Sequence, residues 1–194
     1  MAAGPSDADG LIERFKAGDE GAFDELVLLF QTRIFNLALR MLNSYDDAAE
    51  VTQEIFVRVY RSIGKFRGQS SFLTWLYTVA RNMCCNRLRQ TRRLSRYEVQ
   101  PFESESEDGT HGAPEMADPE RNPAQRAEGQ EIRALVEQGI AALPPDFGTV
   151  MIMRDIQGME YSEIAEALDC SLGTVKSRLS RARLMVREKL SGVL

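Results

Sequence analysis

The sequence predicts an all-α protein in which two small helical domains are joined by an acidic, flexible linker. Apolar residues recur at spacings of three and four along most of the chain, and no segment shows the alternation typical of a half-buried strand. Residues 103–123 are rich in Ser, Glu, Gly and Pro, a composition that cannot bury enough surface to offset chain entropy. We therefore predict a disordered N-terminus over 1–9, a first domain over 10–97, a linker over 98–122 and a second domain over 123–194.

Four helices are expected in the first domain, each with an apolar stripe facing a common core. Asn43 and Ser44 interrupt the pattern, and Ser44 or Asp46 is a suitable N-cap for the third helix. The stripes are, in chain order, Leu11, Ile12 and Phe15; Phe23, Leu26, Leu29 or Phe30, Ile34, Leu37 and Met41; Ala48, Val51, Ile55, Val59 and Ile63; and Phe72, Leu76, Val79 or Ala80, Met83 and Leu88. The last stripe predicts that Thr74, Thr78, Arg81, Cys85, Arg89 and Arg92 share the outer face of the fourth helix.

The second domain begins with a helix signal at Asn122 and Pro123, and that helix is expected to end at Leu143 before two prolines. A further helix should run from Asp146 or Phe147 to about Ile156. The segment YSEIAEALDCSLGTVKSRLSRARLMVREKL then reads as helix, turn, helix.

This last pattern is typical of a DNA-binding helix-turn-helix. Ala165 supplies a small residue for the crossing of the two helices, and Ser171 is a good N-cap for the second. The expected inward residues are Ile164, Leu168, Leu172, Val175, Leu179 and Ala182. Thr174, Lys176, Ser177, Arg178, Arg181 and Arg183 remain on a surface suited to the major groove and its phosphates. The alternative is a solvated basic face on a structural helical hairpin, which the spacing from Ala165 to Arg178 disfavours.

Charge is distributed unevenly along the chain. The formal net charge is −5, yet residues 61–97 contain nine Lys and Arg and no Asp or Glu, and residues 173–194 contain six basic residues and one acidic. Aromatic side chains accompany the first basic block in FRGQSSFLTWLYTVARN, at 66–82. Rings beside arginines suit unpaired bases, because a ring replaces lost base stacking and the arginines follow the phosphates.

Several function classes are disfavoured by what the sequence lacks. No apolar run approaches the ~20 residues that span a bilayer, and MAAGPSDADG is not a signal peptide, so we expect a cytoplasmic protein. Cys84 and Cys85 diverge by about 100° on a helix and His111 lies in the linker, so we expect no metal. We interpret Cys84 and Cys170 as packing residues and Cys85 as an outer-face residue. No cofactor motif or nucleophile-base pair is recognisable, which argues against an enzyme.

Four motifs in order resemble the extracytoplasmic-function RNA polymerase sigma factors of the sigma-70 family, the compact group similar to the envelope-stress factor sigma-E. They are KAGDEGAFDELV at 16–27, DDAAEVTQEIFVRVYRSIGKFRG at 46–68, SSFLTWLYTVARN at 70–82 and YSEIAEALDCSLGTVKSRLSRAR at 161–183. The resemblance implies that 10–97 is sigma region 2 and that 123–194 is sigma region 4. Region 2 binds the β′ clamp helices of RNA polymerase and the minus-ten promoter element; region 4 binds the β flap and the minus-thirty-five element.

The resemblance also assigns site residues. The expected polymerase-binding residues are Asp47, Glu50, Gln53 and Glu54; from the residues alone an ordinary solvated helix face is the better interpretation. The expected minus-ten residues are Phe66, Arg67, Ser70, Ser71, Arg81 and Asn82, with Arg87, Arg89, Arg92 and Arg93 on phosphates. The expected minus-thirty-five residues are Ser171, Thr174, Lys176, Ser177, Arg178, Arg181 and Arg183. Trp75 follows Phe72 by three positions and is better explained as a core residue than as a stacking platform.

Three other functions remain as alternatives. A stand-alone helix-turn-helix regulator would not need residues 46–82. An enzyme would require turnover by the isolated chain. A sequestered interaction protein fits the family, whose members are commonly held inactive by an anti-sigma factor. We expect a sigma factor without cofactor or catalytic residues, whose partners are core RNA polymerase, promoter DNA and an anti-sigma factor.

Overall fold

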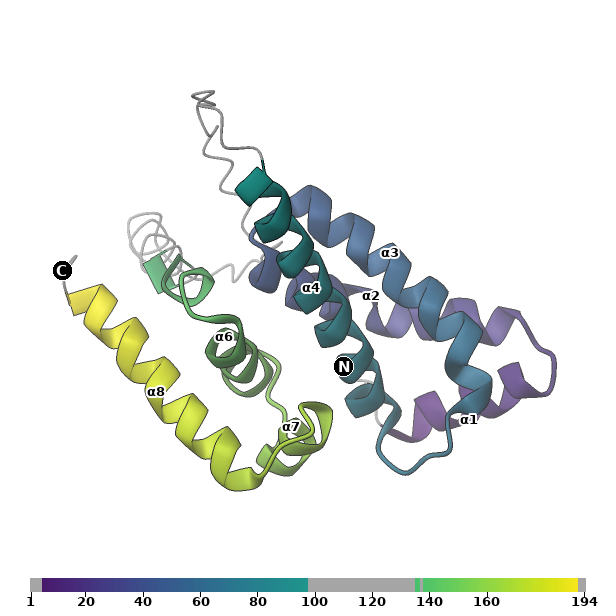
Figure 1. The fold of residues 1–194 in the computed structure, drawn as a ribbon. Helices are drawn as coiled ribbons and strands as arrows, with labels where there is room; N and C mark the ends of the chain where they lie inside the picture. Colours follow the sequence, from purple (N-terminus) through teal and green to yellow (C-terminus); the bar gives the residue numbers. More distant parts are fainter. Residues whose placement is uncertain (1–4, 98–134, 137, 192–194) are drawn as a thin grey trace, which may run out of the picture.

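The computed structural model describes residues 5–97, 135–136 and 138–191, and all regular structure within these ranges is helical. The all-α prediction is confirmed. The predicted linker at 98–122 and the beginning of the predicted 123–143 helix lie outside the described residues. Figure 1 shows the first domain on one side of the long helix α4 and the second domain on the other.

The first domain contains α1 (Pro5–Lys16), α2 (Gly21–Leu42), α3 (Tyr45–Ser62), the short 3-10 helix η1 (Ile63–Lys65) and α4 (Phe72–Tyr97). α2 packs against α1, α3 and α4. It ends where Asn43 adopts the left-handed conformation at φ 52°, and the Ser44 side chain accepts a hydrogen bond from the Asp47 amide at the start of α3. The sequence offered either Ser44 or Asp46 as the N-cap of this helix, and the structure shows that the N-cap is Ser44.

The predicted inward stripes largely form the core. The fully or almost fully buried members on α2, α3, η1 and α4 are Phe23, Leu26, Phe30, Ile34, Leu37, Ala48, Val51, Ile55, Val59, Ile63, Phe72, Leu76 and Ala80. Met41, Val79 and Met83 are half-buried and pack against them. Leu29 is exposed, so Phe30 is the inward residue at that point of α2.

The N-terminus differs from the prediction. α1 begins at Pro5, so residues 5–9, which we expected to be disordered, are helical. Ala8 is buried and precedes Leu11 and Ile12 by three and four positions, so these side chains share one face of the helix. That face packs against α2 and α4, and this tertiary contact extends the helix beyond what the short apolar pattern indicates.

The second domain contains helical residues 138–141, α6 (Pro145–Met151), the π-helical turn η2 (Ile152–Ile156), α7 (Tyr161–Ala167) and α8 (Leu172–Ser191). Pro144 precedes α6 and Pro145 occupies its first turn. Gly158 has φ 72° after η2, in the left-handed region that glycine tolerates. α7 and α8 pack against one another, which confirms the predicted helix, turn, helix order.

The prediction that Leu172 belongs to the core of this domain is wrong. Leu172 is 48% exposed, whereas Val175, Leu179 and Ala182 are buried and the stripe continues to Val186. Leu172 is the first residue of α8, so it lies before the turn at which the helix reaches the core. Ala165, predicted at the helix crossing, is half-buried.

α4 is the element that the two domains share. α7 packs against α4, and the Tyr77 hydroxyl donates a 2.8 Å hydrogen bond to the Gln157 side-chain oxygen. The Tyr77 side chain is only 1% exposed. Tyr77 is not part of the apolar stripe predicted for α4, so the sequence did not indicate that it would be buried. Thr74, expected on the outer face, is buried, and its hydroxyl lies 2.8 Å from the Ser71 hydroxyl at the start of the helix. The second domain meets the expected outer face at Arg81, whose guanidinium lies 3.7 Å from the Asp146 carboxylate.

Replacing Leu76 with Ala is expected to lower the free energy of unfolding by about 2–5 kcal/mol, because Leu76 is fully buried where α4 meets the domain core. Urea unfolding followed by circular dichroism measures this change. Leu28→Ala is the matched control: Leu28 is 70% exposed, and its loss should change stability by less than about 0.5 kcal/mol. Equal losses in both variants would contradict the placement of the core.

Candidate nucleic-acid and polymerase interfaces

One surface of α3 carries the four residues that we expected to contact polymerase. Glu50, Gln53 and Glu54 are exposed and Asp47 is half-buried. They follow one another at helical spacing and form what we call the acidic face of α3. Such a face suits a basic partner surface.

Arg87 of α4 lies against this acidic face. Its guanidinium is 3.2 Å from Asp47, 2.9 Å from Glu50 and 3.6 Å from Glu54, and the Arg87 side chain is 20% exposed. The hydrogen bond from Arg87 holds the pKa of Glu50 below its ordinary value. We expected Arg87 on DNA phosphates; in this structure its guanidinium lies among three carboxylates.

The segment between η1 and α4 forms a loop, residues 66–71, that is held by rings at its two ends. Phe66 packs against Phe72 and Trp75, with ring centroids 5.7 and 5.4 Å away, and Phe72 also contacts Trp75 at 5.8 Å. Trp75 therefore packs against the core, as we favoured. Phe66 is half-buried in the same cluster and also lines a cavity beside the loop.

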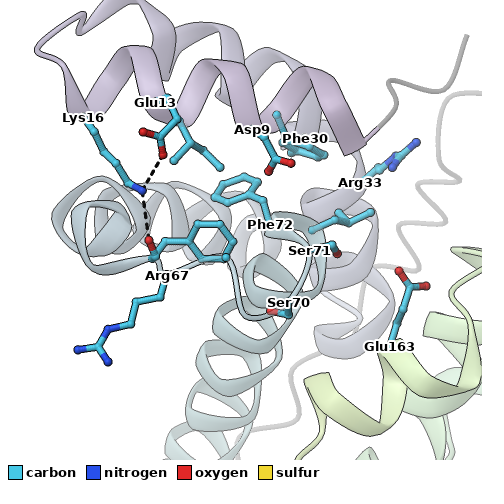
Figure 2. Close-up of a pocket in the computed structure, with 15 residues that line it drawn as sticks. Asp9, Glu13, Lys16, Phe30, Arg33, Arg67, Ser70, Ser71, Phe72 and Glu163 are labelled. Atoms are coloured by element: carbon cyan, nitrogen blue, oxygen red, sulfur yellow. Dashed lines mark hydrogen bonds and ion pairs between the residues drawn. The ribbon is translucent and has the colours of Figure 1, made fainter.

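A cavity of about 570 Å³ lies beside this loop. It is lined by loop residues that include Arg67, Ser70 and Ser71, by α1 residues that include Asp9, and by Glu163 of the second domain. Figure 2 shows Ser70 and Ser71 on the loop, with the Arg67 side chain extending away from the cavity. We call this the loop cavity.

Two local features fix the shape of the loop. Lys16 of α1 donates from Nζ to the Phe66 carbonyl at 3.2 Å and to the Glu13 carboxylate at 2.9 Å (Figure 2). Gly68 has φ 66°, where a side chain would be strained. The Ser71 hydroxyl accepts from the Thr74 amide at 3.1 Å and so caps α4.

A second set of expected DNA residues lies along α4. Asn82, Arg89, Arg92 and Arg93 are exposed and Arg81 is half-buried. Arg81, Arg89 and Arg92 line one cavity wall, and we call these three the basic face of α4. Arg81 donates to the Asn82 side-chain oxygen at 3.1 Å, and Arg89 donates to that of Asn86 at 3.1 Å.

The expected minus-thirty-five residues lie on α8. Ser171 caps the helix by accepting from the Thr174 amide at 3.1 Å, and the Ser177 hydroxyl donates to the Thr174 carbonyl. Lys176 and Arg181 are exposed, and Arg178 is half-buried. We call Thr174, Ser177, Arg178 and Arg181 the basic face of α8, because they line the same cavity as the basic face of α4.

Arg183 lies apart from that set. Its guanidinium contacts the Asp155 carboxylate of η2 at 2.5 and 3.0 Å, within the second domain. The exposed face of α8 thus divides into two sides, and Arg183 belongs to the side that packs toward η2. Its predicted contact with DNA has no support from this placement.

The cavity between the two basic faces measures about 530 Å³. Asp146 of α6 lies in its lining, 3.7 Å from the Arg81 guanidinium and 3.3 Å from that of Arg178. We call it the interdomain cavity.

The three cysteines are free. Cys84 is buried, as expected, and burial raises the pKa of its thiol to about 12. Cys85 is half-buried at the interdomain cavity, and burial raises the pKa of its thiol as well. Within the described ranges no three His, Cys, Asp or Glu side chains gather in a way that could hold a metal ion.

Two protein families match this chain, one in each of its two domains. The profile of sigma-70 region 2 matches residues 26–94, and that of sigma-70 region 4 matches residues 133–186. The RNA polymerase sigma-H factor of Pseudomonas aeruginosa is 38% identical over 185 residues, which cover 95% of this chain and 94% of the relative. The extracytoplasmic-function sigma-E factor of Haemophilus influenzae is 38% identical over 186 residues, 95% of each chain.

The chain belongs to the sigma-70 family and is an extracytoplasmic-function sigma factor. The resemblance drawn from its four motifs is confirmed. A sigma factor of this family is a transcription initiation factor that works with core RNA polymerase and promoter DNA and is not itself an enzyme.

Two solved structures share the fold of this sigma factor. CnrH in complex with the cytosolic domain of CnrY has a TM-score of 0.66 at 21% identity, covering 96% of this chain and 98% of that one. The sigma factor RpoE in complex with the anti-sigma factor NepR from Bartonella quintana has a TM-score of 0.64 at 22% identity, covering 87% and 96%. None of the described helices of this sigma factor is long and apolar enough to cross a membrane.

Sequence reasoning missed several residues at these surfaces. Asp9 of α1 lines the loop cavity, and the spacing of Ala8 to Leu11 and Ile12 was the available signal that α1 starts early. Asp146 and Glu163 reach the first domain from the second, and no pattern in the sequence of either domain identifies such a contact.

Replacing Arg87 of this sigma factor with Met is expected to lower the melting temperature at neutral pH and to make stability less sensitive to acid. Arg87 lowers the pKa of Glu50 below its ordinary value of 4.5, so the pair stabilises the fold above about pH 4.5. That contribution disappears as the pH falls through the lowered pKa of Glu50. The melting temperatures of variant and wild type should therefore converge in acid, as measured by circular dichroism.

The matched control is Arg89→Met, an exposed arginine of the same helix whose guanidinium donates to the Asn86 amide oxygen. It should show no such convergence. A constant difference between Arg87→Met and wild type across this pH range would contradict the assignment.

Proposed function

We propose that this sigma factor binds core RNA polymerase through the acidic face of α3, reads the minus-ten element with the loop 66–71 and α4, and reads the minus-thirty-five element with α8. The observation that carries the proposal is the separation of these three surfaces. The acidic face of α3 and the basic face of α4 lie on different sides of the first domain, and the basic face of α8 belongs to the second domain.

The minus-ten step rests on the loop cavity. Ser70 and Ser71 line a cavity together with the rings of Phe66 and Phe72, and the polar atoms of the two serines suit the hydrogen-bonding edge of an unpaired base. Arg67 points outward, where a guanidinium suits the phosphates of the strand. A base taken from the duplex loses its stacking, and so promoter opening and base capture are coupled.

The remaining minus-ten contacts are proposed along α4. Asn82, Arg89, Arg92 and Arg93 are exposed in the order in which a strand leaving the loop would meet them. Arginines there offset phosphate charge without requiring a sequence, whereas the Asn82 amide is suited to reading a base. Arg87 is left out because it is held by the acids of α3.

The minus-thirty-five step rests on α8. Ser171 and Thr174 lie at the start of the helix, where a recognition helix meets base edges, and Lys176, Ser177, Arg178 and Arg181 follow along it. Arg183 is left out because it pairs with Asp155 of η2 and is not part of the lining of the interdomain cavity, to which Arg178 and Arg181 belong.

Control by an anti-sigma factor is part of the same proposal. Several large apolar side chains of the first domain are exposed, among them Leu28, Val57 and Tyr60, and such surface suits a protein partner. The two solved structures with this fold are complexes, one with the cytosolic domain of CnrY and one with an anti-sigma factor. Relatives named sigma-E support a role in a stress or envelope response, in the cytoplasm.

Run-off transcription with core RNA polymerase on a genomic promoter library tests the function. We expect promoter-dependent transcripts that share minus-ten and minus-thirty-five sequences. The double variant Gln53→Ala, Glu54→Ala should weaken binding to core polymerase, and Glu20→Ala, an exposed carboxylate outside α3, should not. Absence of any complex with core polymerase would contradict the proposal and favour a stand-alone regulator.

Replacing Lys176 or Arg178 with Ala is expected to weaken binding to the minus-thirty-five element. A lost base contact should cost about 1–3 kcal/mol and relax specificity at one position, whereas a lost phosphate contact should weaken all sequences and reduce the salt slope by about one. Binding of polymerase holoenzyme to promoter variants over a range of salt separates the two. The control is Arg187→Ala, exposed further along α8; equal effects in all three variants would place the recognition surface elsewhere.

A further inference from the structure

A single side chain joins the end of α1 to the loop 66–71. Lys16 is the last residue of α1, and its ammonium donates to the Phe66 carbonyl at 3.2 Å and to the Glu13 carboxylate at 2.9 Å (Figure 2). The bond to Phe66 spans 50 positions of the chain, so it connects the first helix of the domain to a segment that follows α3 and η1. The Lys16 side chain is 30% exposed, and most of it therefore lies against the domain.

The end of α1 is itself attached to the centre of the domain. Arg14 pairs with Glu25 of α2 at 3.0 Å, and the Phe15 ring packs against Tyr60 of α3, with the ring centroids 5.3 Å apart. These contacts come from the two residues that precede Lys16. The Lys16 backbone therefore has a defined position, and through its side chain the loop is held to the rest of the domain.

Three groups of Phe66, the residue that Lys16 holds, have partners. Its amide donates to the Ile63 carbonyl of η1 at 3.0 Å, its ring lies 5.4 Å from that of Trp75, and its carbonyl accepts from Lys16. The first two partners are close to Phe66 in the chain, whereas the third belongs to α1. Because a peptide group is planar, the Lys16 bond orients the whole peptide unit between Phe66 and Arg67. It thus fixes the direction in which the chain enters the loop.

The other end of the loop is fixed locally. The Ser71 hydroxyl accepts from the Thr74 amide at 3.1 Å, which attaches the end of the loop to α4. Between the two ends, Gly68 has φ 66°, and Arg67 and Ser70 line the loop cavity. A short loop with both ends fixed loses little conformational freedom when it binds a ligand. Of the two ends, only the first depends on a residue far away in the chain.

The loop cavity shows why the position of the loop matters for reading a base. α1 contributes Asp9 and Lys16 to the lining, and the loop contributes Ser70 and Ser71. The shape of the cavity therefore depends on the distance between α1 and the loop, which Lys16 bridges. Hydrogen bonds distinguish one base from another only where the partner atoms are held at set distances. A mobile loop would have to be ordered at each binding event, and this cost would reduce the gain from the correct base.

From these contacts we infer that Lys16 is a positioning residue for the minus-ten element: it holds the loop 66–71 at the distance from α1 at which the loop cavity selects one unpaired base. The inference rests on the proposed function, because it concerns the same loop. Lys16 acts through the Phe66 backbone and not through DNA. A lysine that contacted a DNA phosphate would instead strengthen the binding of all sequences alike. The two roles therefore differ in their effect on base preference.

The test measures base preference in polymerase holoenzyme that contains the full-length Lys16→Met variant. Fluorescence anisotropy gives the affinity for a labelled non-template strand with the minus-ten element and for the same strand with single base substitutions. The affinity of Lys16→Met for the preferred strand should fall roughly two- to tenfold, as for the loss of one hydrogen bond. The affinity for a strand with the wrong base in the cavity should hardly change, because that base gains nothing from an ordered loop. The preference should therefore fall by the same factor.

Lys65→Met is the matched control. Lys65 is exposed on η1, one residue before Phe66, so this variant removes the same charge close to the loop and leaves the Lys16 bond in place. It should keep the wild-type preference, and any loss of affinity should be equal for all strands. Lys16→Arg keeps a charged donor and should also retain the preference. The inference would be overturned if Lys16→Met kept the preference, if it weakened all strands equally, or if Lys16→Arg lost as much preference as Lys16→Met.

The same measurements distinguish a failure of this inference from a failure of the proposed function. Wild-type holoenzyme that bound all substituted strands alike would overturn the proposed reading of the minus-ten element by the loop. A wild-type preference that persisted in Lys16→Met would overturn the role of Lys16 alone. A duplex that carries only the minus-thirty-five element should bind equally to wild type and to every variant. Weaker binding of that duplex by Lys16→Met would indicate a general defect and would also contradict a role confined to the loop.

Discussion

The packing of α4 against α2 and α3 is the constraint on which the remaining surfaces depend. Phe72, Leu76, Ala80 and Cys84 are buried along one side of this helix and fix its rotation about its own axis. Every other residue of α4 then has a determined direction, since successive residues turn by about 100°. A helix that closes the core of one domain also presents the basic face and contacts the second domain.

This fixed rotation explains why neighbouring arginines have different partners. Arg87 and Arg89 are two positions apart, so they point in roughly opposite directions around the helix. Arg87 meets the three carboxylates of α3, whereas Arg89 lines the interdomain cavity with Arg81 and Arg92. The basic residues of α4 therefore fall into two groups. Arg87 joins α4 to the acidic face of α3, and Arg81, Arg89 and Arg92 form the basic face of α4.

The acidic net charge of the sigma factor is compatible with DNA binding because the charges are segregated in space. The acids of α3 lie beside Arg87, and Asp146 and Glu163 of the second domain lie beside the proposed DNA surfaces. Carboxylates next to a DNA surface weaken binding for as long as they stay there.

Much of this protein is determined by its sequence. Helical periodicity gave the inward stripes of α2, α3 and α4, side-chain oxygens gave the caps at Ser44 and Ser171, and four motifs gave the family. These features depend on residues close together in the chain, which periodicity and capping detect. Arg87 and Arg183 pair with carboxylates that lie 28 to 40 positions away in the chain, which local patterns do not detect. The early start of α1 and the exposure of Leu172 depend on how each helix packs against its neighbours. Only the tertiary structure decided that Tyr77 is buried and that two basic faces share one cavity, because such contacts form between surfaces whose local sequence patterns are each complete without the other.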